Sequence, residues 1–239
     1  TINVTSGVVD PTALTASSPL LLSAGDAGVA LQADPLGTSN LLIEGLSYVT
    51  VAGFVFMGGP VAPGDEAQLQ IGTAANGATH ITVQGGFFAA TGGTPAEHCI
   101  SIPSSAIPSS DITLSGSVLP LNIQGGQGSA ITATDVSALI IEDCASLEDN
   151  ESESAVTLTR CTGVRMSRIH SAVNDGRTLH AVDTTQLTIV NCLFSGAPST
   201  SAHTAYEVLK IEPGGGGQTQ FDIYNNTFRL MFTDPAHFT

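Results

Sequence analysis

The residues whose types could carry out chemistry gather in the last third of the chain. All six basic side chains follow position 159: Arg160, Arg165, Arg168, Arg177, Lys210 and Arg229. The same segment also contains His180, His203, Glu207 and Glu212. A Lys or His base beside a second cation can remove the proton α to the carboxylate of a uronate sugar, because the cation stabilises the negative charge that develops. These residue types predict either a site of this kind or, more simply, a solvated polar patch.

Charge is unevenly distributed along the 239 residues. The net charge is −15, and the first 159 residues hold fifteen of the 21 acidic residues and no Lys or Arg. Nucleic acid binding needs a cationic track that releases counterions, so this part of the chain is not predicted to bind nucleic acid. An anionic ligand is expected on the carboxy-terminal part, where the cations lie. No run of the sequence approaches the roughly 18 apolar residues of a membrane span.

Short apolar segments with a period of two residues recur along the chain. The clearest are the triplets 49–51, 81–83, 112–114, 139–141, 164–166, 187–189 and 221–223. Their first residues are 32, 31, 27, 25, 23 and 34 positions apart, as in the coils of a solenoid. Pairs of mostly apolar residues precede the triplets by gaps of 6 or 10 positions: Leu41/Ile43, Leu69/Ile71, Ile100/Ile102, Ile131/Ala133, Val156/Leu158, Leu179/Ala181 and Leu209/Ile211.

A further column lies two positions after each triplet. Its members are Gly53, Gly85, Gly116, Asp143, Arg168, Asn191 and Asn225. Gly and Asn tolerate the left-handed conformation of a sharp bend, so this column predicts a tight turn between two strands. In these repeats the sequence resembles the right-handed parallel β-helix superfamily, which includes pectate-lyase-like enzymes, tailspikes and adhesins. The expected fold is all-β, with about seven to eight rungs of three short strands. Residues 1–37 would form an amino-terminal cap or first coil and residues 38–239 the β-helix, together a single domain.

The resemblance implies that a sugar-processing site would lie on the first sheet, beside loops of variable length. Its outward residues are expected to be Leu42, Gln70, Ser101, Thr132, Thr157, His180 and Lys210. The last two are ionisable, and this leads to a catalytic assignment for His180, Lys210 and Arg177. The neighbouring side chains assigned to substrate binding are His203, Glu207 and Glu212.

The motifs of the known enzymes of this superfamily are missing, so catalysis stays open. The first hypothesis is a rigid carbohydrate-contacting or adhesive module of an extracellular, secreted or virion-surface protein. The alternative is a polysaccharide lyase, epimerase or hydrolase that acts on an acidic polysaccharide. The expected partner is a polysaccharide or cell-surface glycan. No capping segment is evident after Phe232, so homo-oligomerisation or continuation in another domain is also expected.

Other polar groups have mainly structural interpretations. Asp135, Arg160 and Asp183 occupy one turn position in three consecutive rungs and predict a charge ladder. The acidic residues 148–153 predict a solvated loop, with calcium binding through carboxylate oxygens as the alternative. No other cofactor or metal site is predicted. Cys144 and Cys192 fall in one inward column but two rungs apart, which is too far for a disulfide, so free buried thiols are expected.

Overall fold

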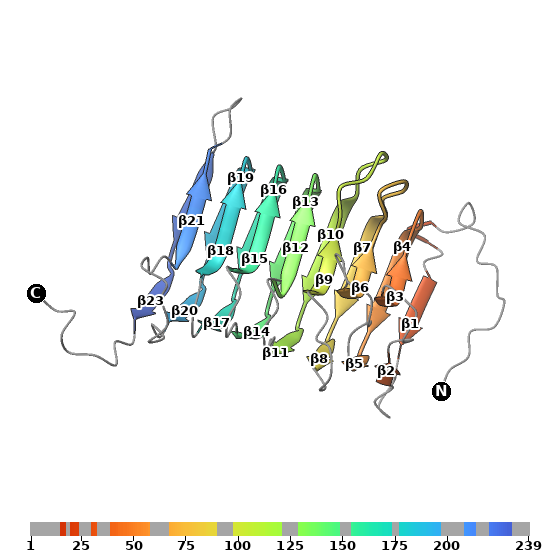
Figure 1. The fold of residues 1–239 in the computed structure, drawn as a ribbon, viewed down its shortest axis with the longest axis horizontal. Helices are drawn as coiled ribbons and strands as arrows, with labels where there is room; N and C mark the ends of the chain where they lie inside the picture. The colour runs from red at the N-terminus through yellow and green to blue at the C-terminus, as the bar shows by residue number, and fades with distance from the viewer. Residues whose placement is uncertain are drawn as a thin grey trace, which may run out of the picture.

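The structure, a computed structural model, describes residues 15–17, 20–23, 30–32, 39–57, 67–89, 98–120, 129–148, 154–173, 177–196, 208–213 and 220–230. Within these ranges the chain forms strands and no helix, and the strands stack in three parallel sheets along one axis (Figure 1). The predicted fold class, an all-β parallel β-helix, is therefore confirmed. No helix in the described ranges has the length and apolar character needed to cross a membrane.

The first sheet has seven strands and contains the residues expected to face a ligand. Its strands are β3 (Ser39–Ile43), β6 (Ala67–Ile71), β9 (His98–Ile102), β12 (Ile131–Thr134), β15 (Ser154–Thr159), β18 (Arg177–Val182) and β21 (Leu209–Glu212). Neighbouring strands pair through the predicted apolar positions; Leu41 aligns with Leu69, for example, and Leu179 with Leu209. The register read from the sequence is thus the register of the sheet.

The second sheet has eight strands and contains the seven triplets. Its strands are β1 (Leu20–Ser23), β4 (Ser47–Ala52), β7 (Thr79–Gln84), β10 (Ser110–Ser115), β13 (Ser137–Glu142), β16 (Thr162–Ser167), β19 (Thr185–Val190) and β22 (Phe221–Tyr224). The first residues of successive triplets are direct partners in every pair from β4 to β22. Alternation along each strand sends the outer two residues of a triplet inward and the middle one outward.

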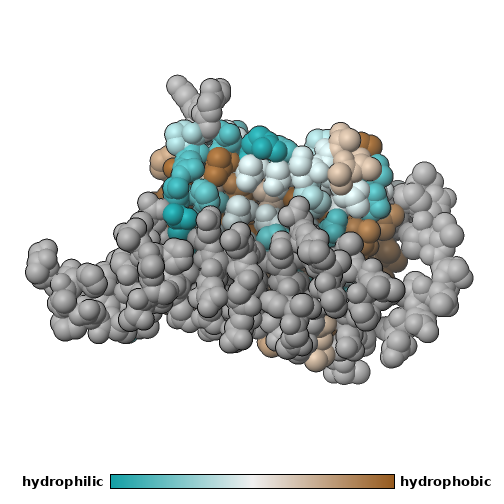
Figure 2. All heavy atoms as spheres, in the orientation of Figure 1, coloured by the Kyte–Doolittle hydropathy of each residue, from teal (hydrophilic) through white to brown (hydrophobic). Residues whose placement is uncertain are grey.

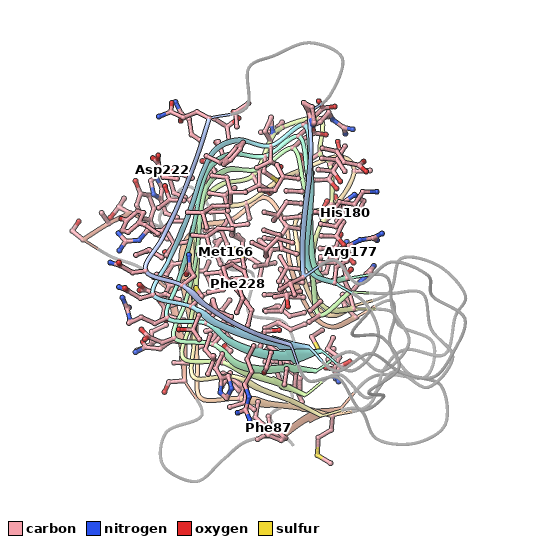
Figure 3. All side chains as sticks on the ribbon, turned by 90° about the vertical axis from the view of Figure 1, so that its left-hand side faces the viewer. Phe87, Met166, Arg177, His180, Asp222 and Phe228 are labelled. Carbon is pink, nitrogen blue, oxygen red and sulfur yellow. The ribbon has the colours of Figure 1, made fainter. Side chains whose placement is uncertain are left out.

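The third sheet also has eight strands and closes the cross-section. Its strands are β2 (Ala30–Gln32), β5 (Val55–Met57), β8 (Phe87–Ala89), β11 (Val118–Pro120), β14 (Ala145–Glu148), β17 (His170–Val173), β20 (Leu193–Gly196) and β23 (Thr227–Leu230). Seen along the axis, the three sheets enclose a core filled by side chains (Figure 3). Strands β1 and β2 belong to the segment 1–37 and pair with β4 and β5, so this segment adds to two of the sheets.

The predicted bend between the second and third sheets is present in every rung from β4 to β22. All seven residues of that column have positive φ, from 53° at Arg168 to 74° at Gly53. A left-handed conformation is costly for a side chain as large as that of Arg168. This side chain lies over the bend of the preceding rung, where its guanidinium binds the Asp143 carboxylate.

The core between the sheets is apolar and closely packed. The rings of Phe56 and Phe88 have no exposed surface and stack with centroids 4.4 Å apart. Cys99, Cys144, Cys161 and Cys192 are free and buried, in agreement with the prediction for the two that share a column. Burial raises the pKa of Cys144 to about 11, so this thiol is uncharged at neutral pH and packs as a small apolar group.

Candidate functional site

The outward-facing ionisable residues of the first sheet lie on its last two strands. His180 of β18 is the direct register partner of Lys210 of β21. Leu179 and Ala181, on either side of His180, are fully buried, so the His180 side chain points away from the core. Figure 3 shows His180 on the outer side of this sheet, and Figure 2 shows hydrophilic side chains gathered over β18 and β21.

Glu212 connects these two residues. Positions 210 and 212 lie on the same side of β21, and the Lys210 ammonium forms an ion pair with Glu212 Oε1. The other carboxylate oxygen, Oε2, lies 3.5 Å from His180 Nε2. The hydrogen bond from Lys210 is the main reason that the pKa of Glu212 is lower than usual, and the nearby imidazole of His180 acts in the same direction. His180, Lys210 and Glu212 therefore form one cluster.

The imidazole of His180 is incompletely hydrogen-bonded. Its Nε2 atom is buried and has no hydrogen-bond partner of good geometry. The 3.5 Å separation from Glu212 exceeds the usual 2.7–3.2 Å of an N–H···O hydrogen bond. A buried polar atom without a partner is costly, so this nitrogen would gain a hydrogen bond if the Glu212 side chain shifted to admit a ligand hydroxyl.

Of the other assigned residues, Arg177 is the one that the structure describes. Arg177 is the first residue of β18 and lies on the outer side of the same sheet, three residues or roughly 10 Å along the strand from His180 (Figure 3). His203 and Glu207 lie outside the described residues, as do most of the variable loops and residues 149–153 of the acidic segment. Within the described ranges there is no group of three or more His, Cys, Asp or Glu residues that could hold a metal ion.

Acid is expected to abolish the contribution of Glu212 to stability. The folded protein binds the carboxyl proton more weakly than the unfolded chain does, because the pKa of Glu212 is lowered on folding. The ion pair thus adds stability above the ordinary glutamate pKa, and this contribution disappears as the pH falls through the lower pKa of the folded state. The urea midpoint of Glu212→Gln should lie slightly below that of the native sequence at about pH 7 and coincide with it at about pH 2. An equal difference at both pH values would show that ionisation of Glu212 is not the cause.

Two further cations are neutralised by carboxylates on neighbouring rungs. Arg160 binds both oxygens of Asp135, each at 2.7 Å, which confirms that part of the predicted ladder. The pKa of Arg160 is raised mainly by these bonds and to a smaller extent by the charge of Asp183, for which the structure records no hydrogen bond to Arg160. Arg168 binds Glu142 at 2.9 Å and Asp143 at 2.6 Å. Three of the six basic side chains, Lys210, Arg160 and Arg168, are thus paired with carboxylates.

A second polar region, not anticipated from the sequence, lies on the outer face of the second sheet. Tyr48 stacks on His80 with ring centroids 4.5 Å apart and an angle of 9° between the planes. His80 Nδ1 lies 3.8 Å from Asp111 Oδ2. Each of the three residues immediately precedes a triplet, so extending the alignment by one position would have revealed the column. Alternation alone also places these positions outward, because each precedes an inward residue.

Comparison with known proteins gives little beyond the fold. No family model matches the chain, and no curated protein sequence matches it. Among solved structures, the chain is similar to ORF18 of Geobacillus virus E2, with a TM-score of 0.49 and 14% sequence identity. The similarity covers 86% of this chain, which spans 37% of the length of that phage protein.

Proposed function

We propose that the chain is a rigid, non-catalytic β-helix module of an extracellular or virion-surface protein and that it contacts carbohydrate through the outer face of its first sheet. The proposal rests on one observation, the convergence of Lys210, Glu212 and the buried Nε2 atom of His180. A sugar hydroxyl donates one hydrogen bond and accepts others, so it can satisfy the imidazole nitrogen and the carboxylate together.

The arrangement of charges favours binding over proton abstraction. An amine that acts as a base needs a free lone pair, whereas the Lys210 ammonium is engaged with Glu212. The Glu212 carboxylate also repels the carboxylate of a uronate substrate, while it suits the hydroxyls of a neutral sugar. A lyase, epimerase or hydrolase acting on an acidic polysaccharide is the alternative, with His180, Lys210 and Arg177 as its catalytic residues.

The scaffold suits a module that holds a binding face in place. Each rung pairs with the next through all three sheets, so the outer residues of successive rungs keep a fixed spacing of about 4.8 Å. A repeating ligand such as a glycan chain matches a surface that repeats along one axis. Residues on rigid strands also lose little conformational entropy on binding.

Binding to immobilised neutral and uronate polysaccharides tests this proposal. His180→Ala and Lys210→Met are each expected to weaken binding to a neutral glycan by about tenfold, as expected for the loss of one or two hydrogen bonds to a charged or polar group. Thr188→Ala is the control, since Thr188 lies on β19, which belongs to the second sheet and not to the proposed face. Its binding should equal that of the native sequence.

The same proteins, incubated with uronate polysaccharides, distinguish the catalytic alternative. A lyase creates an unsaturated uronate whose ultraviolet absorbance increases with time. We expect no increase for any of the proteins. An increase that disappears in Lys210→Met would replace the binding proposal by the lyase alternative. Equal binding by His180→Ala, Lys210→Met and Thr188→Ala would move the glycan contact away from this face.

A further inference from the structure

The outer face of the second sheet is hollowed near the amino-terminal end of the solenoid. The hollow has a volume of about 430 Å³ and is lined by residues of β4, β7, β10 and β13. Its polar side chains form two columns: Tyr48, His80 and Asp111, and Thr50, Thr82 and Thr113. It belongs to a different sheet from His180 and to different rungs, so it is separate from the cluster on β18 and β21.

The first column is continuous along the axis. Tyr48 stacks on His80, and the imidazole of His80 in turn faces the carboxylate of Asp111 at 3.8 Å. Asp111 Oδ2 also accepts a hydrogen bond of 3.0 Å from the Ser110 hydroxyl. The side chains of His80 and Asp111 are close to half exposed. The column thus presents a phenol ring, an imidazole and a carboxylate to one open space.

The second column consists of hydroxyl groups at a regular spacing. Thr50, Thr82 and Thr113 are direct register partners on β4, β7 and β10. The rungs are about 4.8 Å apart, which is similar to the advance per sugar along an extended 1,4-linked glycan. Within the described part of the chain no hydrogen bond involves these three hydroxyls, although each lies in the wall of the hollow. They can therefore donate to and accept from a ligand.

Both columns lose their polar character at the same rung. On β13 the position of Asp111 is taken by Ala138, and Ile140 aligns with Thr113. The two columns therefore share one boundary, and the polar surface between β4 and β10 is about 10 Å long. A column of threonines that only reflected strand propensity would have no reason to end together with the Tyr–His–Asp column.

The three residues of the first column share one backbone conformation. Tyr48, His80 and Asp111 have φ values of 59°, 54° and 54°. The register skips them, since Ser47 pairs with Thr79 and the next pair joins Val49 with Ile81. Glycine can adopt this conformation without strain, and Gly163 does so in a later rung of the same column. Ala138 and Gln186 have it too, so the conformation belongs to the scaffold and recurs at this position from rung to rung.

We propose that this hollow binds a neutral oligosaccharide whose chain runs along the solenoid axis across β4, β7 and β10. The hydroxyls of successive sugars meet the three threonines, and the Asp111 carboxylate accepts hydrogen bonds from one of the sugars. The ligand is neutral because the hollow contains a carboxylate and the first 159 residues contain no Lys or Arg to balance an anionic sugar. This site does not depend on the contact proposed at His180.

Binding of soluble neutral β-1,4-linked glucan, xylan and mannan oligosaccharides, measured by isothermal titration calorimetry, tests the inference. Thr82→Val removes one hydroxyl and keeps the shape of the side chain, and Asp111→Asn keeps a residue that tolerates positive φ. Each substitution is expected to lower the affinity for the best-bound oligosaccharide by roughly tenfold. Thr188→Val is the matched control, because Thr188 has the same outward position on β19, beyond the hollow. The affinity of Thr188→Val for the same oligosaccharide should equal that of the native sequence.

The outcomes separate the two carbohydrate proposals. His180→Ala should leave the affinity of the hollow unchanged, whereas it weakens binding at the first sheet. Equal thermal midpoints for Thr82→Val and the native sequence would show that a loss of affinity does not come from unfolding. If none of the three oligosaccharide classes binds, or if Thr82→Val and Asp111→Asn bind as tightly as Thr188→Val, the inference is overturned whether or not the site at His180 exists.

Discussion

Replacing Phe88 with Ala is expected to lower the free energy of unfolding by about 3–5 kcal/mol. The ring of Phe88 is fully buried and stacks on Phe56 of the preceding rung with an angle of 2° between the planes. Its removal leaves a cavity inside the solenoid, and the surrounding strands cannot move in to fill it because parallel hydrogen bonds fix their spacing. Urea denaturation of the two proteins measures the difference.

Phe87→Ala is the control for this prediction. Phe87 is the neighbouring residue on β8, and the substitution removes the same number of atoms. Its side chain points away from the core and is 41% exposed (Figure 3). The expected loss is less than about 1 kcal/mol, because the ring is already largely in contact with water. Equal losses for Phe87→Ala and Phe88→Ala would contradict the orientation of β8 described above.

The effect of Phe88→Ala should also be local. In a solenoid each rung contacts its neighbours, so stability is close to a sum of rung and interface contributions. Amide hydrogen exchange is expected to accelerate most in β5, β8 and β11 and least in β17 and β20. Uniform acceleration over all strands would instead indicate that the solenoid unfolds as a single cooperative unit.

Much of the fold could be predicted because each rung repeats the same physical solution. Val49 and Ile81 must both face the core, so the spacing between them gives the length of one coil. The bend residues could be recognised at Gly53 and Asn225 because few residue types adopt positive φ without cost. A single segment of this kind would be ambiguous, and its recurrence in seven rungs removes the ambiguity.

The candidate sites were harder to predict because they depend on contacts between rungs. The sequence shows where Lys210 lies, but not that Glu212 engages its ammonium and lies near His180. Tyr48 and His80 were missed for a different reason. They stand one position before the apolar triplets, and the alignment of the repeats was limited to the triplets and the columns built from them.

Replacing Gly77 with Ala is expected to cost about 2–3 kcal/mol, because the space for a methyl group is already filled by backbone. Gly77 is buried between β6 and β7, where its N–H donates to the carbonyl of Ile107 in the next rung at 2.8 Å. A Cβ atom at this position would overlap that carbonyl oxygen and lie 2.6 Å from the nitrogen of Ser109 and 2.7 Å from the carbonyl carbon of Pro108. None of these atoms can rotate away, so the two rungs would have to separate locally.

Gly85→Ala distinguishes this steric effect from the conformational preference of glycine. Gly85 has a φ of 64°, and a Cβ atom there would meet no atom within 4 Å. The substitution is expected to cost about 1 kcal/mol, the ordinary penalty for alanine in the left-handed region. The urea midpoint of Gly77→Ala should therefore be lower than that of Gly85→Ala. The reverse order would mean that the bends, and not the close approach of successive rungs, limit the stability of the solenoid.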